Sequence, residues 1–176
     1  MLRPRLIPAL LYRNKGLVKT KQFKNYKYIG DPLNAVRIFN EKNVDELLFI
    51  DIDATQKIQD PDYELIRKVS AECRMPLTYG GGIKNVKQIE KIISLGVEKV
   101  SLSSAAIKNP SLISNCASRV GSQSVVVTLD VIRSGFLKNN IDVMIYNGRE
   151  KSNFSLKSLI KTIQDNGVGE IIINFI

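Results

Sequence analysis

The residues best suited to bind a ligand lie in segment 76–83, which reads Pro-Leu-Thr-Tyr-Gly-Gly-Gly-Ile. Its glycines, which include Gly81 and Gly82, follow an apolar run and precede a helix-like segment. Bare backbone N–H groups beside a helix N-terminus can bind a phosphate group. The alternative is a tight turn, although three consecutive glycines exceed what such a turn requires. Ser103 and Ser104 end the next apolar run, and we expect their hydroxyls beside the same anion.

Carboxylates follow two of the apolar runs. Asp51 and Asp53 close the run 46–50, and Asp130 closes the run 124–129. At the C-terminal ends of parallel strands, carboxylates face the mouth of the sheet, where a general acid or base would work. For Asp51 the alternative is a helix cap or a salt bridge. Asp130 is harder to explain as a surface residue, and it is the catalytic candidate.

Four charged residues lie at the starts of apolar runs, at the opposite end of the predicted strands. They are Arg5, Glu46, Lys99 and Glu170. Alternation along the strands directs several of these side chains into the floor of a barrel, where two bases and two acids can form a ring of salt bridges. The ring is interpreted either as a structural plug or as a gate on a passage through the barrel.

The elements that position these residues alternate regularly. Apolar runs predict buried strands at 5–10, 46–50, 77–79, 99–102, 124–129 and 170–173. Helical periodicity predicts helices at 32–42, 61–73, 86–95, 110–119 and 156–166. Asp31, Asp60 and Asn109 each precede a proline and are expected to cap a helix. Strand–helix alternation indicates an α/β fold with a parallel sheet. A β-hairpin, with its turn at Asn139-Asn140, is expected within 132–147.

A weak internal repeat relates the two halves of the chain. Residues 6–11 resemble 125–130, and residues 43–50 resemble 167–174. Two halves of four strand–helix units each would form an eight-stranded TIM-type barrel, which takes about 250 residues. The sequence therefore predicts one partial barrel domain over 1–176, with six of the eight units; an open six-stranded sheet is the alternative. In the repeat, Leu11 occupies the position of Asp130, so one of two symmetric carboxylates is absent.

Composition excludes several classes of protein. The chain has 176 residues, 44% of them hydrophobic, no histidine and two cysteines, so we expect neither a zinc site nor a Ser-His or Cys-His catalytic pair. No metal or cofactor is expected. No apolar run reaches the roughly 20 residues of a membrane span, and we expect a cytoplasmic protein. The net charge of +9 favours a phosphorylated ligand over nucleic acid, because no nucleic-acid motif accompanies it. Segment 13–27, with Lys19, carries bases and no acid; it is interpreted as a solvated loop or as a mobile loop over the ligand.

Taken together, these segments resemble the HisF family, the cyclase subunit of imidazole glycerol phosphate synthase and a (βα)8 barrel. The resemblance extends over essentially the whole chain. It rests on the glycine loop together with Leu6-Ile-Pro, Gly16-Leu-Val-Lys, Asp45-Glu-Leu-Leu-Phe-Ile-Asp-Ile-Asp, Lys99-Val-Ser, Ala105-Ala-Ile-Lys-Asn-Pro, Gly121-Ser-Gln and Gly169-Glu-Ile-Ile-Ile.

The resemblance implies a heterodimer with a HisH-like glutaminase that docks on the N-terminal face. Ammonia would cross the barrel and attack a phosphorylated ribonucleotide, giving imidazole glycerol phosphate and AICAR in histidine biosynthesis. By resemblance, the four charged residues at the strand starts match the ammonia gate, Lys19 matches a loop lysine over the substrate, Gly82 and Ser104 match a phosphate site, and Asp130 matches one of two catalytic aspartates.

Two departures from the family pattern leave alternatives open. Leu11 stands where the family has its other catalytic aspartate, and Ser103 replaces an asparagine. The segment 10–20 instead resembles a HisF-like branch found with surface-polysaccharide genes, which implies a subunit that channels ammonia to a separate amidotransferase. The second phosphate site of the family has no counterpart before residue 176. A truncated, inactive chain is the third interpretation.

Overall fold

The computed structural model describes residues 3–135 and 140–176. Six strands form a curved parallel sheet, and consecutive strands are neighbours. They are β1 (Ala9–Arg13), β4 (Leu47–Asp51), β5 (Leu77–Gly80), β6 (Lys99–Leu102), β7 (Val125–Ser134) and β10 (Glu170–Phe175). The α/β fold of the TIM-barrel type predicted from the sequence is confirmed. Within the described residues β1 and β10 do not pair with each other, so the barrel wall is open between them.

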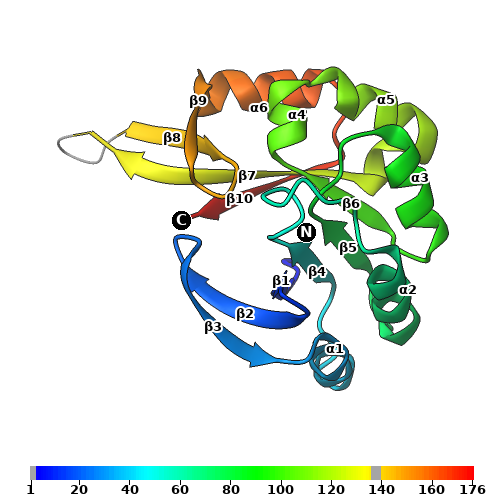
Figure 1. Ribbon diagram of the computed structural model, residues 1–176. Helices are drawn as coiled ribbons and strands as arrows, with labels where there is room; N and C mark the ends of the chain where they lie inside the picture. Colours follow the sequence, from blue (N-terminus) through cyan, green and yellow to red (C-terminus); the bar gives the residue numbers. More distant parts are fainter. Residues whose placement is uncertain (1–2, 136–139) are drawn as a thin grey trace.

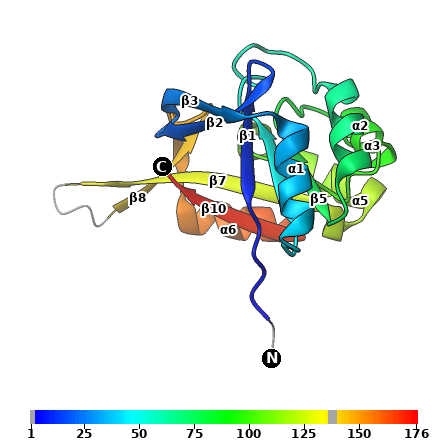
Figure 2. The ribbon, with the colours of Figure 1, turned by 90° about the horizontal axis from the view of Figure 1, so that it is seen from below.

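Helices connect the parallel strands and lie on the outer side of the sheet (Figure 1). They are α1 (Pro32–Glu41), α2 (Tyr63–Glu72), α3 (Val86–Ser94), α5 (Ser111–Val120) and α6 (Leu156–Asp165), with the short α4 (Ser104–Lys108) and a 3-10 turn, η1 (Ser122–Ser124), as additions. Their buried side chains, such as Val36, Ile66 and Ile89, pack against outward residues of the strands. Figure 2 shows α6 beside β10 and the segment before β1 extending from the body.

Only one of the three predicted helix caps is correct. Asp31 caps α1 by accepting a hydrogen bond from the N–H of Asn34 at 3.0 Å. The prediction for Asp60 is wrong, because α2 begins later and Asp62 accepts from the N–H of Leu65 instead. The prediction for Asn109 is also wrong, since α4 ends at this residue and α5 has no side-chain cap.

The basic segment 13–27 is a β-hairpin rather than a loop, which corrects the interpretation of the sequence. β2 (Gly16–Lys21) pairs antiparallel with β1, and β3 (Lys24–Gly30) pairs with β2. Both turns have two residues with positive φ, as type I′ turns require: Asn14 and Lys15 (47° and 62°), then Gln22 and Phe23 (51° and 55°).

A second antiparallel extension follows the C-terminal half of β7. β8 (Asn140–Ile145) pairs with residues 130–134 of β7, and β9 (Glu150–Ser155) pairs with β8. Asn139, in the turn expected from the sequence, lies outside the described residues. β9 was not predicted, because its sequence is mostly polar. Among the described helices, none combines the length and the apolar character that a bilayer crossing demands.

Candidate functional site

A cavity of about 1090 Å³ opens at the C-terminal ends of the parallel strands. Loops after β4, β5 and β6 form one side of it, and the tips of the β2–β3 and β8–β9 hairpins form the other. Gly81, Gly82, Ser103, Ser104 and Asp130 all line this cavity. Five of the residues proposed from sequence as ligand-binding or catalytic therefore lie around one space.

The glycine loop has a backbone that only glycine adopts without strain. Gly81 and Gly82 have φ angles of +114° and +70°. A Cβ at Gly81 would lie 2.2 Å from the carbonyl oxygen of Asp51, and one at Gly82 would lie 2.8 Å from the Cβ of Ala54. The loop is therefore packed directly on the segment after β4, with its amides beside the cavity.

The N-terminus of α3 is less available to an anion than the sequence indicates. Asn85 accepts from the N–H of Gln88 at 3.0 Å, and the Gln88 side chain accepts from the N–H groups of Lys84 and Asn85. These hydrogen bonds form a capping box, which satisfies the amides of Lys84, Asn85 and Gln88 at the start of the helix. The Gly82 N–H makes one long hydrogen bond, to Thr55 Oγ1 at 3.4 Å, so the loop amides and the serine hydroxyls remain as candidate phosphate ligands. Ser104 already accepts from the N–H of Tyr146 at 2.9 Å, and its own O–H is free to donate.

Gly82→Val is expected to abolish binding of inorganic phosphate at this loop. The branched side chain would meet Ala54 and the carbonyl of Gln59 in a backbone conformation that valine avoids. Isothermal titration of the parent and the variant with phosphate measures the loss. Gly121→Val is the matched control, because Gly121 also has a positive φ but has no atom within 4 Å of its added Cβ. Phosphate binding that survives in Gly82→Val would contradict the assignment.

Lys19 is not brought to the cavity. It is exposed on β2, while the next residue, Thr20, lines the cavity. The Lys19 side chain is not part of the cavity lining. Any contribution of Lys19 to ligand capture in this arrangement is long-range attraction, which salt weakens.

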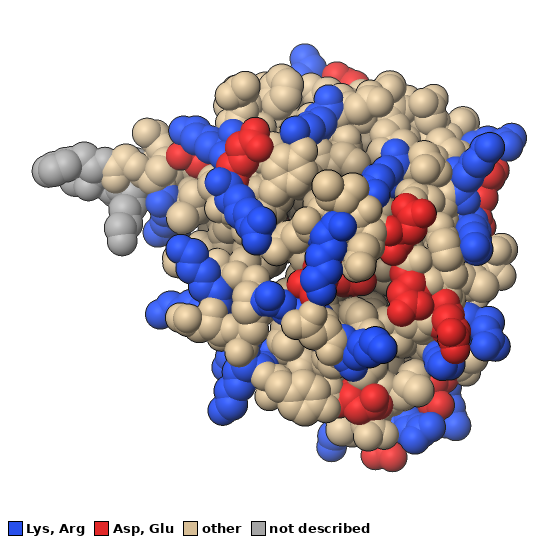
Figure 3. Space-filling model, viewed as in Figure 1, with Lys and Arg blue, Asp and Glu red and all other residues tan. Residues whose placement is uncertain are grey.

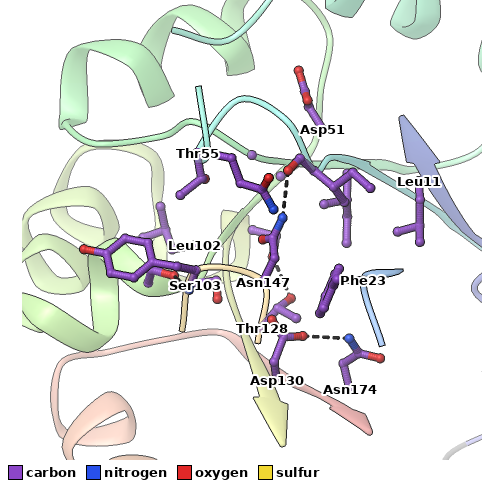
Figure 4. Close-up of a pocket in the computed structure, with 18 of the residues that line it drawn as sticks. Leu11, Phe23, Asp51, Thr55, Leu102, Ser103, Thr128, Asp130, Asn147 and Asn174 are labelled. Atoms are coloured by element: carbon purple, nitrogen blue, oxygen red, sulfur yellow. Dashed lines mark hydrogen bonds between the residues drawn. The ribbon is translucent and has the colours of Figure 1, made fainter. Parts of the chain in front are cut away.

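Asp130 is the carboxylate that faces the cavity from the end of the barrel interior. It is 7% exposed, and its Oδ1 accepts from the side-chain amide of Asn174 at 2.6 Å (Figure 4). The parallel register of β7 and β10 sets Asn174 directly beside Asp130. Burial raises the pKa of Asp130, and the hydrogen bond from Asn174 partly opposes this shift. A carboxyl group of this kind is suited to exchange protons with a bound ligand.

The two other acidic candidates have structural partners. Asp51 lines the cavity, but its Oδ1 accepts from the N–H groups of Asp53 and Ala54 at 2.9 and 3.0 Å. Burial raises the pKa of Asp51, and these two hydrogen bonds oppose the shift. Asp53 is buried between Arg13 at 3.2 Å and Lys57 at 2.7 Å. Both carboxylates thus organise the loop after β4.

Leu11 lies on β1 beside Ile50 of β4 and lines the cavity. In the view of Figure 4, Phe23 lies between Leu11 and Asp130. The position that the internal repeat pairs with Asp130 is therefore at the cavity, and it carries an aliphatic side chain.

The four charged residues from the strand starts form one connected cluster at the other end of the sheet. Glu46, which is 3% exposed, accepts from Arg5 at 2.9 Å and from Lys99 at 2.9 and 3.1 Å. Glu170 accepts from Arg5 at 2.8 Å and from Lys99 at 3.0 Å. Although burial raises the pKa of Glu170, the bonds from Arg5 and Lys99 lower it overall. Arg5 lies before β1 rather than at its first residue, because β1 begins at Ala9.

Buried hydroxyls lie between this charged cluster and the cavity. Thr78 donates to Glu46 at 2.7 Å, and Ser101 is hydrogen-bonded to Thr128 at 2.7 Å. Ser101 and Thr128 also line the cavity. Sequence reasoning missed all three, although each hydroxyl stands between two hydrophobic neighbours in its strand, which is a usable signal. The three hydroxyls therefore lie on the strand segments between the charged cluster and Asp130.

The β8–β9 turn, which lines the cavity opposite the loop after β4, was also missed. Asn147 donates to the carbonyl of Ile52 at 2.7 Å, and Arg149 donates to Gln56 at the same distance. Both bonds tie the turn to the loop after β4. Within the ranges 3–135 and 140–176, no group of three or more His, Cys, Asp and Glu side chains is placed to hold a metal ion.

Comparisons with known proteins agree with this geometry. A family model described as histidine biosynthesis protein matches residues 5–176. A Vibrio vulnificus protein with the provisional name imidazole glycerol phosphate synthase subunit hisF3 is 56% identical over 176 residues, which are 100% of this chain and 67% of that protein. A provisionally named HisF subunit of Leptospira borgpetersenii is 54% identical over the whole chain and 69% of its own length.

A more distant relative carries the same subunit name without that qualification. The imidazole glycerol phosphate synthase subunit HisF of Alkaliphilus metalliredigens is 37% identical over 173 residues, which are 98% of this chain and 68% of the relative. The chain thus spans about two thirds of the length of these relatives. By the family model and by these identities, the chain belongs to the HisF family of histidine biosynthesis proteins.

Proposed function

We propose that the chain acts as the ammonia-using synthase subunit of a glutamine amidotransferase. The observation that carries this proposal is the row of buried hydroxyls, Thr78, Ser101 and Thr128, on the strands between the charged cluster and the cavity that Asp130 lines. Ammonia is small and both donates and accepts hydrogen bonds, so a passage with hydroxyls along it can conduct ammonia between two ends of a barrel.

At the mouth, each group has a task that suits its chemistry. The amides of Gly81 and Gly82 and the hydroxyls of Ser103 and Ser104 would hold the phosphate of the substrate without taking part in proton transfer. The Asp130 carboxylate would take a proton from the attacking nitrogen and return it during ring closure. The substrate would be the phosphoribulosyl-formimino aminoimidazole carboxamide ribonucleotide, and the products imidazole glycerol phosphate and AICAR.

At the other end, the charged cluster would face a HisH-type glutaminase in a heterodimer. Lys99, with its side chain 16% exposed, bridges Glu46 and Glu170, so its movement would open or close the passage. The names of the relatives, which designate a synthase subunit, support a partner of this kind.

Stimulation of a HisH-type glutaminase tests this proposal. Glutamate release is expected to rise when the chain is added, and Lys99→Met is expected to change this coupling, because two ion pairs at the gate are lost. Lys87→Met, at an exposed position of α3, is the matched control and should behave like the parent. A parent chain that leaves glutamate release unchanged would refute the docking role.

Leu11 favours a second candidate function. An aliphatic side chain at the cavity cannot exchange protons, which impairs cyclisation but leaves ammonia conduction intact. The chain would then deliver ammonia to a separate enzyme that amidinates a surface-polysaccharide sugar. Normal glutaminase stimulation without cyclase turnover would select this second function.

A further inference from the structure

The β2–β3 hairpin carries a concentration of positive charge outside the lining of the cavity. Its exposed side chains include those of Lys19, Lys21, Lys24 and Lys27; Lys15 is exposed in the turn before β2, and residues 13–30 contain no acid. Figure 3 shows Lys and Arg side chains gathered over this part of the molecule. We refer to Lys19, Lys21, Lys24 and Lys27 as the lysine face.

The register of the hairpin sets these lysines against one another. Lys19 is directly opposite Lys27, and Lys21 is directly opposite Lys24. Like charges in directly opposed positions destabilise a pair of strands. Among the residues with described structure, no carboxylate lies within ion-pair distance of any of the four. The lysines of the hairpin therefore repel one another, and the carboxylates of an acidic partner would reduce this repulsion.

Protection of a free sheet edge explains only part of this pattern. β3 is the last strand on its side of the described sheet, and lysines on such strands prevent association between edges. That accounts for Lys24 and Lys27. It does not account for Lys19 and Lys21, because β2 is an inner strand, paired with β1 on one side and with β3 on the other.

The edge strand also exposes side chains that favour protein contacts. Tyr28 is 66% exposed and Ile29 is 56% exposed, next to Lys27 on β3. Exposed aromatic and aliphatic residues beside a free strand edge suit an added strand, which gains main-chain hydrogen bonds as well as side-chain contacts. A nucleic acid would use the charge but not the backbone groups of β3.

We propose that the β2–β3 hairpin is the docking site for an acidic, extended segment of a partner protein. The segment adds as a strand to the free edge of β3, and its carboxylates neutralise the lysine face. The hairpin tip, with Thr20, Gln22 and Phe23, lines the cavity. The partner therefore sits at the rim of the mouth, where it has access to whatever leaves the cavity. This inference stands independently of the reaction catalysed there.

Binding of a labelled synthetic peptide of about twelve alternating Glu and Val residues tests this inference, with fluorescence anisotropy as the readout. The double variant Lys21→Glu/Lys24→Glu is expected to lower the affinity about ten-fold or more, since two attractive contacts become repulsive. Lys157→Glu/Lys161→Glu, at exposed positions of α6, makes the same change of net charge away from the hairpin and should bind like the parent. Parent affinity should also fall as salt is added.

Hydrogen exchange distinguishes an added strand from simple charge attraction. Backbone amides of β3 are expected to exchange more slowly when the peptide is bound, because the free edge becomes paired. A single-stranded DNA oligonucleotide of equal charge should bind through the lysines without protecting β3. The proposal is wrong if the peptide does not bind, if it binds without protection of β3, or if the oligonucleotide protects β3 to the same extent.

Discussion

With ammonia supplied directly, the chain is expected to turn over the cyclase substrate about 10²–10⁴-fold more slowly than a cyclase with both catalytic carboxylates, since a positioned proton-transfer group contributes that much. Leu11 lines the cavity at the position that the internal repeat pairs with Asp130. Free ammonia bypasses any glutaminase partner, so the measurement reports the chemistry at the mouth alone. Robust turnover by the parent would refute this account of position 11.

Substitutions at position 11 separate proton transfer from shape. Leu11→Asp is expected to raise turnover. Leu11→Asn should remain at the parent rate, because asparagine has the size of aspartate but cannot act as a base. Leu11→Asp/Asp130→Asn should also remain low, because Asp130 supplies the other half of the pair. Equal rates for Leu11→Asp and Leu11→Asn would show that a carboxylate at this position is not what the reaction lacks.

Stability provides a check that Asp130→Asn changes chemistry rather than folding. Burial raises the pKa of Asp130, with the Asn174 bond opposing it, so the ionised carboxylate disfavours the folded state. As the pH rises from the unfolded-state pKa of about 4, the unfolded chain loses its proton first, and stability falls. Asp130→Asn removes this effect. The variant is expected to melt higher than the parent near neutral pH, with a difference that shrinks toward about pH 4.

The strand–helix alternation could be predicted because burial on both faces leaves a continuous apolar run in each parallel strand. Leu77 and Val100 belong to such runs, and both are buried. The meeting of Arg5, Glu46, Lys99 and Glu170 could be predicted for the same reason, since the first residues of parallel strands lie at one end of a sheet. Which of these acids bonds to which base could not be predicted, because side-chain rotamers and the exact limits of the strands determine the pairing.

The hairpin over 13–30 could not be predicted, because its turns lack the usual residues. Type I′ turns favour Asn-Gly, and these turns contain Asn14-Lys15 and Gln22-Phe23. Packing of Leu17 and Val18 in the core stabilises the strands despite the lysines. The partner of Asp130 was missed as well. Asn174 becomes adjacent to Asp130 only through the register of β7 and β10, which no local pattern contains.

Removing the charge of Glu46 is expected to have the largest effect on folding. Glu46→Gln leaves Lys99 with only Glu170 as an ionised partner, in a position where the Lys99 side chain is 16% exposed. Breaking a buried ion pair by removing one partner costs about 3–5 kcal/mol. Because Glu170 remains, we expect a loss of roughly 3 kcal/mol in the free energy of unfolding, the lower end of that range, measured by urea denaturation.

A surface pair provides the control for this loss. Glu64 and Lys68 on α2 form an ion pair at 2.8 Å with both side chains largely exposed, so Glu64→Gln should unfold at nearly the parent urea concentration. If Glu46→Gln is no less stable than Glu64→Gln, the charged cluster does not hold the barrel floor together.

The double variant Glu46→Gln/Lys99→Met tests whether the two residues act as a unit. Each single change leaves a charge in the floor with one fewer partner, whereas the double change removes both charges from the same contact. We therefore expect the double variant to lose less stability than the sum of the two single variants. Additive losses would mean that Glu46 and Lys99 are stabilised independently. If the gate opens when the Lys99 ammonium moves between Glu46 and Glu170, the ammonium must interact with both carboxylates. Such a gate therefore requires the non-additive result.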